Sequence, residues 1–102
     1  MMPSITTHSL KGGRLAQAAA MLCQDPGFRL YLDHRKRHKL GLCISQLPDG
    51  THSEQDAREW LCAACNIQSR AELDHHPQVA ATFHAIRSRF RRWYLRQRPR
   101  SA

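Results

Sequence analysis

The chain has no long apolar run and no recognisable secretory leader. No stretch is apolar over the roughly 20 residues that a helix needs to span a bilayer. Residues 1–8 lack the charged start, apolar centre and small-residue cleavage site of a signal peptide. We therefore expect a cytoplasmic protein with no membrane partner.

The chain has no recognisable disulfide framework. The four cysteines are Cys23, Cys43, Cys62 and Cys65. Thiols stay reduced in the cytoplasm, so they are expected to be buried thiols or metal ligands. No serine or cysteine lies in a recognisable nucleophile elbow, and the histidines cluster near arginines rather than carboxylates. These features favour a protein that is not an enzyme.

Acidic residues are scarce as well. Against 16 Lys and Arg the chain has 8 Asp and Glu, which gives a formal net charge of +8. After Asp74 no acidic residue follows, although this segment contains seven arginines. Solvated surfaces usually mix both signs, so such a run repels itself unless a polyanion neutralises it. The predicted partner is nucleic acid, or an acidic surface of a nucleic-acid-processing protein complex.

The length and the apolar pattern together predict one small helical domain. A chain of 102 residues can form one modest core. We expect a flexible N-terminus over residues 1–8, a single helical domain over 9–97 and a basic C-terminal tail over 98–102. The predicted fold class is all-α, with four or five helices and a long basic C-terminal helix.

Spacing and turn residues place the individual helices. Pro48, Asp49 and Gly50 indicate a turn, so a loop over 42–50 is expected to separate two helical halves. We expect helices over residues 13–24, 26–40, 53–65 and 77–95, and a single helical turn over 70–73.

Capping residues define the boundaries of the second half. Thr51 or Ser53 is expected to cap the third helix, with Glu54 completing a capping box from Thr51. Asn66 is expected to end that helix in a left-handed conformation. Asp74, shortly before a proline, offers a start for the last helix.

The last predicted helix has the strongest periodic pattern. Five apolar residues recur at steps of four and three and so share one helical face: Val79, Phe83, Ile86, Phe90 and Trp93. We expect this face to pack on Leu22, Phe28, Tyr31, Leu32, Trp60 and Leu61. A second copy of the chain is an alternative partner for the same face, so a homodimer stays open.

Two basic clusters are the candidate binding surface. One lies at the end of the second helix, and the other occupies the remaining faces of the last helix. Arginine suits phosphate because its planar fork donates two hydrogen bonds, and a tyrosine outside the apolar face is placed to stack on a base. The predicted nucleic-acid-binding residues are Arg35, Lys36, Arg37, Lys39, Arg87, Arg91, Arg92, Tyr94 and Arg96.

One segment offers metal ligands. Cys62 and Cys65 form a Cys-x2-Cys pair, and Asp-His-His-Pro follows at 74–77. This order resembles the opening half of the HNH endonucleases, which implies a zinc knuckle, a histidine that activates water and an aspartate that helps hold a catalytic metal. The chain departs from that family because its single asparagine, Asn66, precedes the Asp-His pair. We predict no catalytic residue and no cofactor, with zinc at Cys62, Cys65, His75 and His76 as the alternative.

A wider similarity covers about residues 22–93. It is carried by residues 50–52, 60–61, 65–67 and 69–74 and by the closing pattern of Phe83, Phe90 and Trp93. These segments resemble small proteins of tailed phages and prophages that accompany recombination and replication genes. The resemblance implies a non-catalytic DNA-binding accessory of phage DNA metabolism. The alternatives are an inhibitor of a host complex, such as a RecBCD-type nuclease or a CRISPR effector, and a degenerate HNH-like metal nuclease.

Overall fold

The computed structural model of the chain describes residues 13–97, and both predicted terminal segments, 1–8 and 98–102, lie outside this range. No strand forms within residues 13–97, so the predicted all-α fold class is confirmed. In chain order, the elements are α2 (Arg14–Gln24), α3 (Pro26–Leu40), α4 (Glu54–Cys65), the 3-10 helix η1 (Arg70–Asp74) and α5 (Pro77–Gln97).

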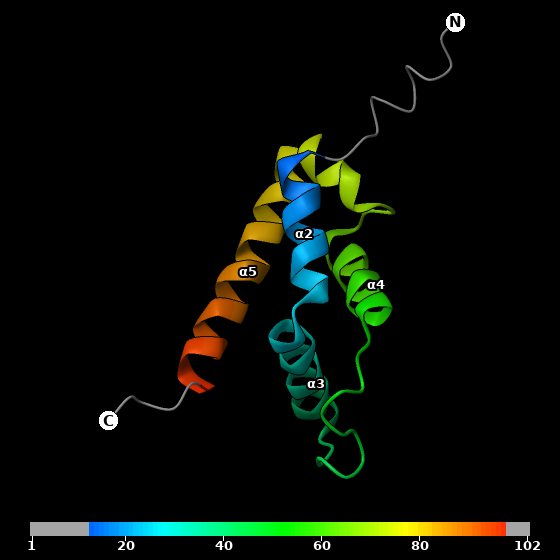
Figure 1. The fold of residues 1–102 in the computed structure, drawn as a ribbon, viewed down its shortest axis with the longest axis vertical. Coiled ribbons are helices and arrows are strands. Elements are labelled where there is room, and N and C mark those ends of the chain that lie inside the picture. The colour runs from blue at the N-terminus through cyan, green and yellow to red at the C-terminus, as the bar shows by residue number, and fades with distance from the viewer. Residues whose placement is uncertain (1–12, 98–102) are drawn as a thin grey trace, which may run out of the picture.

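The helices pack along one long axis (Figure 1). α2 and α3 follow one another nearly end to end, and α4 runs back beside them. η1 returns the chain to the start of α2, and α5 then descends along α3 and α4. The last turns of α5 spread away from α3, which leaves the arginine-rich end of α5 open on several sides.

The sequence signals for α3 agree with the structure at both ends. Asp25 is the N-cap, and its Oδ1 accepts a hydrogen bond from the backbone N–H of Gly27 at 2.8 Å. Pro26 occupies the first helical turn, where its missing N–H costs nothing. The helix ends at Gly41, whose φ of 66° lies in the left-handed region that glycine adopts without strain.

The cap of α4 differs in part from the prediction. Ser53 is the N-cap, and its partner in the capping box is Asp56 rather than Glu54. Ser53 lies directly before the first helical residue, so its Oγ reaches the backbone N–H of Asp56 at 3.0 Å. The Oγ1 of Thr51 instead donates to the carbonyl oxygen of Pro48 at 2.6 Å, inside the preceding turn. Asn66 ends α4 with a φ of 58°, as predicted.

Asp74 does not start the last helix as predicted, because its carboxylate caps α2 instead. The carboxylate accepts hydrogen bonds from the backbone N–H groups of Gly13, Leu15 and Ala16 at 2.7, 3.0 and 3.0 Å. Partial burial by itself raises the pKa of Asp74. The three N–H donors outweigh that effect and hold the pKa below its usual value.

The predicted apolar face of α5 packs against the core of the same chain. Phe83 and Ile86 are buried, and Val79, Phe90 and Trp93 pack against the buried cluster. Aromatic rings connect the helices: Phe28 and Phe90 have ring centroids 5.3 Å apart, and Tyr31 and Trp93 have centroids 5.4 Å apart. Each such pair adds about 0.5–1.5 kcal/mol beyond the burial of its apolar area.

Candidate nucleic-acid interface

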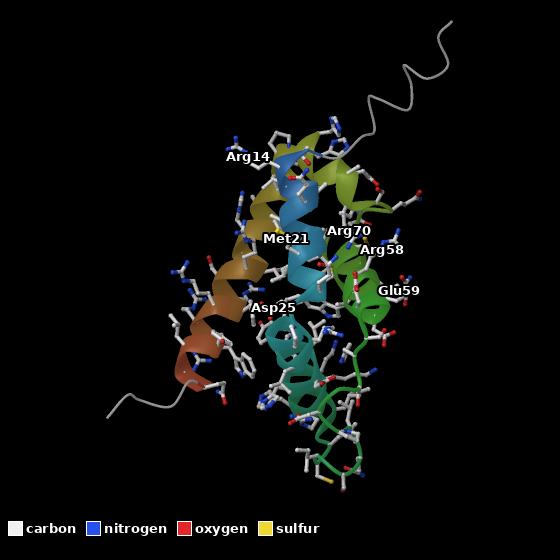
Figure 2. All side chains as sticks on the ribbon, in the orientation of Figure 1. Arg14, Met21, Asp25, Arg58, Glu59 and Arg70 are labelled. Atoms are coloured by element: carbon white, nitrogen blue, oxygen red, sulfur yellow. The ribbon has the colours of Figure 1, made fainter. Side chains whose placement is uncertain are left out.

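The arginines of α5 lie on the outside of the molecule. Their side chains are exposed at Arg87, Arg89, Arg91, Arg92 and Arg96, and the helix contains no acidic residue. Nitrogen-tipped side chains project from its outer edge (Figure 2). The helical period turns the apolar residues to the core, so these charges are directed to solvent.

No carboxylate of the described residues forms an ion pair with the arginines of α5. Within residues 13–97, Arg37 is the only lysine or arginine that forms an ion pair with a carboxylate. Even α5 residues beside the core keep a free guanidinium: the Cζ of Arg87 lies 5.3 Å from the ring centroid of Phe83, a cation–π contact that leaves the N–H groups available. The described surface therefore presents concentrated positive charge.

Three predicted residues come together in a shallow groove along α5. Arg87, Arg91 and Tyr94 line it, and the groove has a volume of about 470 Å³. The remaining lining residues are Leu22, His84, Ser88 and Phe90. Arg92 and Arg96 do not line this groove, although both are exposed on the same helix.

Tyr94 is anchored on one side and open on the other. Its ring centroid lies 5.8 Å from that of Phe90. The ring also packs closely on Gly27, because a Cβ added to that glycine would lie only 3.3 Å from Cε1 of Tyr94. The residue nevertheless remains 44% exposed. A fixed aromatic ring beside two guanidinium groups is suited to stack on a base while the arginines bind phosphate.

A second basic site lies on α3. Arg35, Lys36 and Lys39 line a pocket of about 240 Å³, together with Leu32, Leu40, His52 and Trp60. The guanidinium of Arg35 lies 5.4 Å from the ring centroid of Trp60 and 5.9 Å from that of Tyr31. Three of the four residues predicted in this cluster therefore share one concave surface.

Arg37, the fourth predicted residue, is not on that surface. Its side chain is only 11% exposed and its Nη2 lies 2.9 Å from Oδ1 of Asp49. Its Nη1 donates to the carbonyl oxygen of Leu47 at 2.7 Å. Arg37 points to the loop after α3 because it lies on a different helical face from Lys36 and Lys39, and it ties that loop to the helix.

Two residues of the α3 site were missed from the sequence, Asp33 and His52. Asp33 is fully buried, and its Oδ1 lies 2.6 Å from Nδ1 of His52. Asp33 is the single acidic residue in the sequence of α3, which is otherwise strongly basic. A single acidic residue in a basic helix could have marked Asp33 as a residue with a specific partner, because a buried acid needs several hydrogen-bond donors. The identity of its partner, 19 residues away, was not readable.

The four residues of the alternative zinc site do not form one cluster. Cys62 and Cys65 are buried on α4, and burial raises the pKa of both thiols. His75 and His76 lie exposed just before α5. Across residues 13–97, no group of three or more His, Cys, Asp or Glu side chains is placed to hold a metal ion.

Comparisons with family models, curated proteins and solved structures found no match to this chain. The resemblances to phage proteins and to HNH endonucleases therefore stay predictions. Among the helices formed by residues 13–97, none has both the length and the apolar character needed to cross a membrane.

Proposed function

We propose that this protein is a non-catalytic basic accessory protein that binds nucleic acid through the α5 groove and the α3 pocket. One observation carries the proposal: within the described range, the cations at both places have no carboxylate partner and lie beside aromatic rings. The assignment to phage DNA metabolism rests on the resemblance over residues 22–93.

Phosphate contacts account for this arrangement better than base readout. Lys and Arg side chains that replace condensed counterions give affinity that depends on salt and not on sequence. A recognition helix that reads base edges presents its first turns to the major groove. η1 spans only Arg70–Asp74 and packs on α2 and α5, so it offers no such helix. We therefore propose binding with little base specificity.

Fluorescence anisotropy with labelled single-stranded and duplex DNA tests the proposal. The observed association constant should fall linearly on logarithmic axes as salt rises from about 50 to about 200 mM. The double variant Arg87→Gln/Arg91→Gln should reduce the slope by about 1.8 for duplex, or by about 1.4 for a single strand. Replacement by glutamine keeps the length and polarity of the side chain and removes its charge.

A matched control removes the same charge elsewhere. Arg14 lies on α2 and Arg58 on α4 (Figure 2), and neither residue lines the α5 groove. The variant Arg14→Gln/Arg58→Gln should keep a slope near that of the parent protein. Equal losses in both double variants would show attraction to net charge alone and would contradict a defined interface.

Two further outcomes separate the alternatives. If neither DNA binds at low salt, the nucleic-acid proposal fails and the acidic surface of a host protein complex becomes the better partner for the arginines. Incubation of the probes with Mg²⁺ should leave them intact. Cleavage that is abolished by His75→Ala would instead favour the HNH-like nuclease.

A further inference from the structure

The α3 pocket differs from the α5 groove in that it contains a histidine held by a buried carboxylate. Oδ2 of Asp33 accepts a hydrogen bond from the backbone N–H of Gly50 at 2.7 Å, and Oδ1 accepts one from the backbone N–H of His52 at 3.0 Å. Oδ1 also lies 2.6 Å from Nδ1 of His52. Asp33 thus fixes both the backbone and the imidazole of His52.

This contact decides which ring nitrogen of His52 is left for a ligand. A carboxylate is only an acceptor, so Nδ1 of His52 must be the protonated nitrogen in this contact. Nε2 is the ring nitrogen that remains for a ligand in the pocket that His52 lines. When both ring nitrogens carry protons, Nε2 donates a hydrogen bond into the pocket and Nδ1 keeps its bond to Asp33.

Three cations line the pocket beside His52. The pocket lining contains Arg35, Lys36 and Lys39 and no acidic residue. Asp33 is fully buried behind His52, with both of its oxygens already bonded. Asp56, on α4, feels the charges of His52 and Lys36, but its carboxylate accepts the backbone N–H of Ser53 at 3.0 Å in the capping box. The groups free to bind a ligand are therefore the three cations and Nε2 of His52, which donates when the imidazole carries both protons.

The pocket is also partly ordered before any ligand binds. The guanidinium of Arg35 rests against Trp60 and Tyr31, and His52 is only 12% exposed and is held by Asp33. Groups that are already in place lose less conformational entropy on binding. At about 240 Å³, the pocket is smaller than the roughly 300–1,000 Å³ of sites for drug-sized ligands, so it suits a small charged group.

We propose that this pocket binds the phosphate monoester of a nucleotide, with Lys36, Lys39 and Nε2 of His52 on the phosphate oxygens. A phosphate monoester carries about −1.5 to −2 charges and three acceptor oxygens, which matches several cations and a donor better than a bridging phosphodiester does. Arg35 and Trp60 line the same pocket and would contact the sugar or the base. This proposal rests on the proposed function. It assigns one of the two nucleic-acid-binding sites, the α3 pocket, to a phosphorylated strand end or a free nucleotide.

Two single-stranded DNA probes of one sequence, about 12 nucleotides long, test this pocket. One probe has a 5′-phosphate and the other a 5′-hydroxyl, and both have a fluorophore at the 3′ end. The phosphorylated probe should bind the full chain about tenfold more tightly at fixed salt. Lys36→Gln/Lys39→Gln should abolish this preference, and Arg14→Gln/Arg58→Gln should retain it.

A second variant tests the histidine without disturbing its structural bond. His52→Asn places an amide N–H near the position of Nδ1, so the bond to Asp33 is kept, but nothing replaces Nε2. This variant should keep the melting temperature and lose most of the phosphate preference. A preference unchanged in both His52→Asn and Lys36→Gln/Lys39→Gln would overturn the proposal.

Calorimetry with adenosine monophosphate and with adenosine separates the two sources of the phosphate. Binding of the monophosphate but not of adenosine supports the site with a free nucleotide as its ligand. A preference seen only between the two DNA probes supports it with a strand end. If neither preference is seen while the hydroxyl probe still binds with a steep salt slope, this inference fails and the proposed function stands. If only the phosphorylated probe binds, this inference stands, and the salt-dependent backbone binding of the proposed function fails.

Discussion

Asp74 caps α2 from 61 residues further along the chain, with Oδ2 placed 2.7 Å from the backbone nitrogen of Gly13. A helix begins with N–H groups that have no partner inside the helix, and α2 has no side-chain cap of its own at Gly13. The carboxylate of Asp74, from a distant part of the same chain, supplies that cap. Closure of η1 onto α2 therefore stabilises both the start of the first described helix and the entry into α5.

Replacement of Asp74 should destabilise the protein in a way that depends on pH. Asp74→Ala should lower the free energy of unfolding by about 1–2 kcal/mol at neutral pH, as for loss of other N-caps. Because the folded pKa lies below the unfolded value of about 3.9, the stabilisation is fully present above that value and is lost as the pH falls through the folded pKa.

Urea unfolding of parent and variant at several pH values checks this prediction. The difference in stability between them should shrink once the pH drops below about 4. Glu59→Ala is a suitable control, because Glu59 lies exposed on α4 (Figure 2) and should change stability by no more than about 0.5 kcal/mol. A difference that stays constant down to the acid transition would contradict the cap.

Asp33 should be among the most sensitive positions for stability. Asp33→Ala removes the carboxylate that accepts hydrogen bonds from the backbone N–H groups of Gly50 and His52 and that contacts the His52 imidazole. Loss of one partner of a buried pair costs about 3 kcal/mol or more. Thermal and chemical unfolding should show that loss, whereas His52→Asn should retain most of the stability. Equal stability of parent and Asp33→Ala would refute the bonding described for the loop.

Arg37 should matter for stability and not for nucleic acid. Arg37→Gln loses the bond to the Leu47 carbonyl and the ion pair with Asp49, which should cost about 1–3 kcal/mol. The salt slope for DNA binding should stay unchanged, because the guanidinium is turned toward the loop. Anisotropy on the variant below its melting temperature measures this directly. A slope reduced by about 0.9 for duplex would show that Arg37 does contact phosphate.

The four cysteines should react at very different rates with iodoacetamide. Cys43 is exposed, and its hydrogen bond with Ser45 lowers the pKa of the thiol, so more thiolate is present near neutral pH. Burial raises the pKa of the thiols at Cys23, Cys62 and Cys65. Mass spectrometry of labelled peptides should therefore find Cys43 modified first. A Cys43→Ser variant should lose the fast phase, and fast labelling at Cys62 would contradict its buried position.

Local patterns in the sequence predicted much of the fold. Helical spacing identified every α-helix within residues 13–97, and Asp25, Gly41 and Asn66 marked helix ends that the structure confirms. These signals act over a few residues, so they can be read without knowledge of the tertiary structure. The choice of Ser53 over Thr51 was harder, because both residues can cap and only the path of the turn after Pro48 decides between them.

The candidate site was predicted only in part. Exposure of the α5 arginines follows from the helical period, since residues off the apolar face point to solvent. The packing of α2, α3 and the loop after α3 decides which of these arginines share a groove with Leu22. The same packing turns Arg37 toward Asp49. A pattern along the chain contains no such information.

By itself, the sequence determined the helices, the apolar face of α5 and the excess of positive charge, because all three follow from residue type and spacing over short distances. Tertiary structure alone decided where the two long-range carboxylates act. Asp74 could have begun α5 and Asp33 could have paired with a neighbouring arginine, yet one caps α2 and the other holds His52. The physical reason is that a partly or fully buried carboxylate is stabilised by whichever N–H donors the packed chain brings within hydrogen-bond distance. Those donors lie 58–61 residues from Asp74 and 17–19 residues from Asp33 along the sequence.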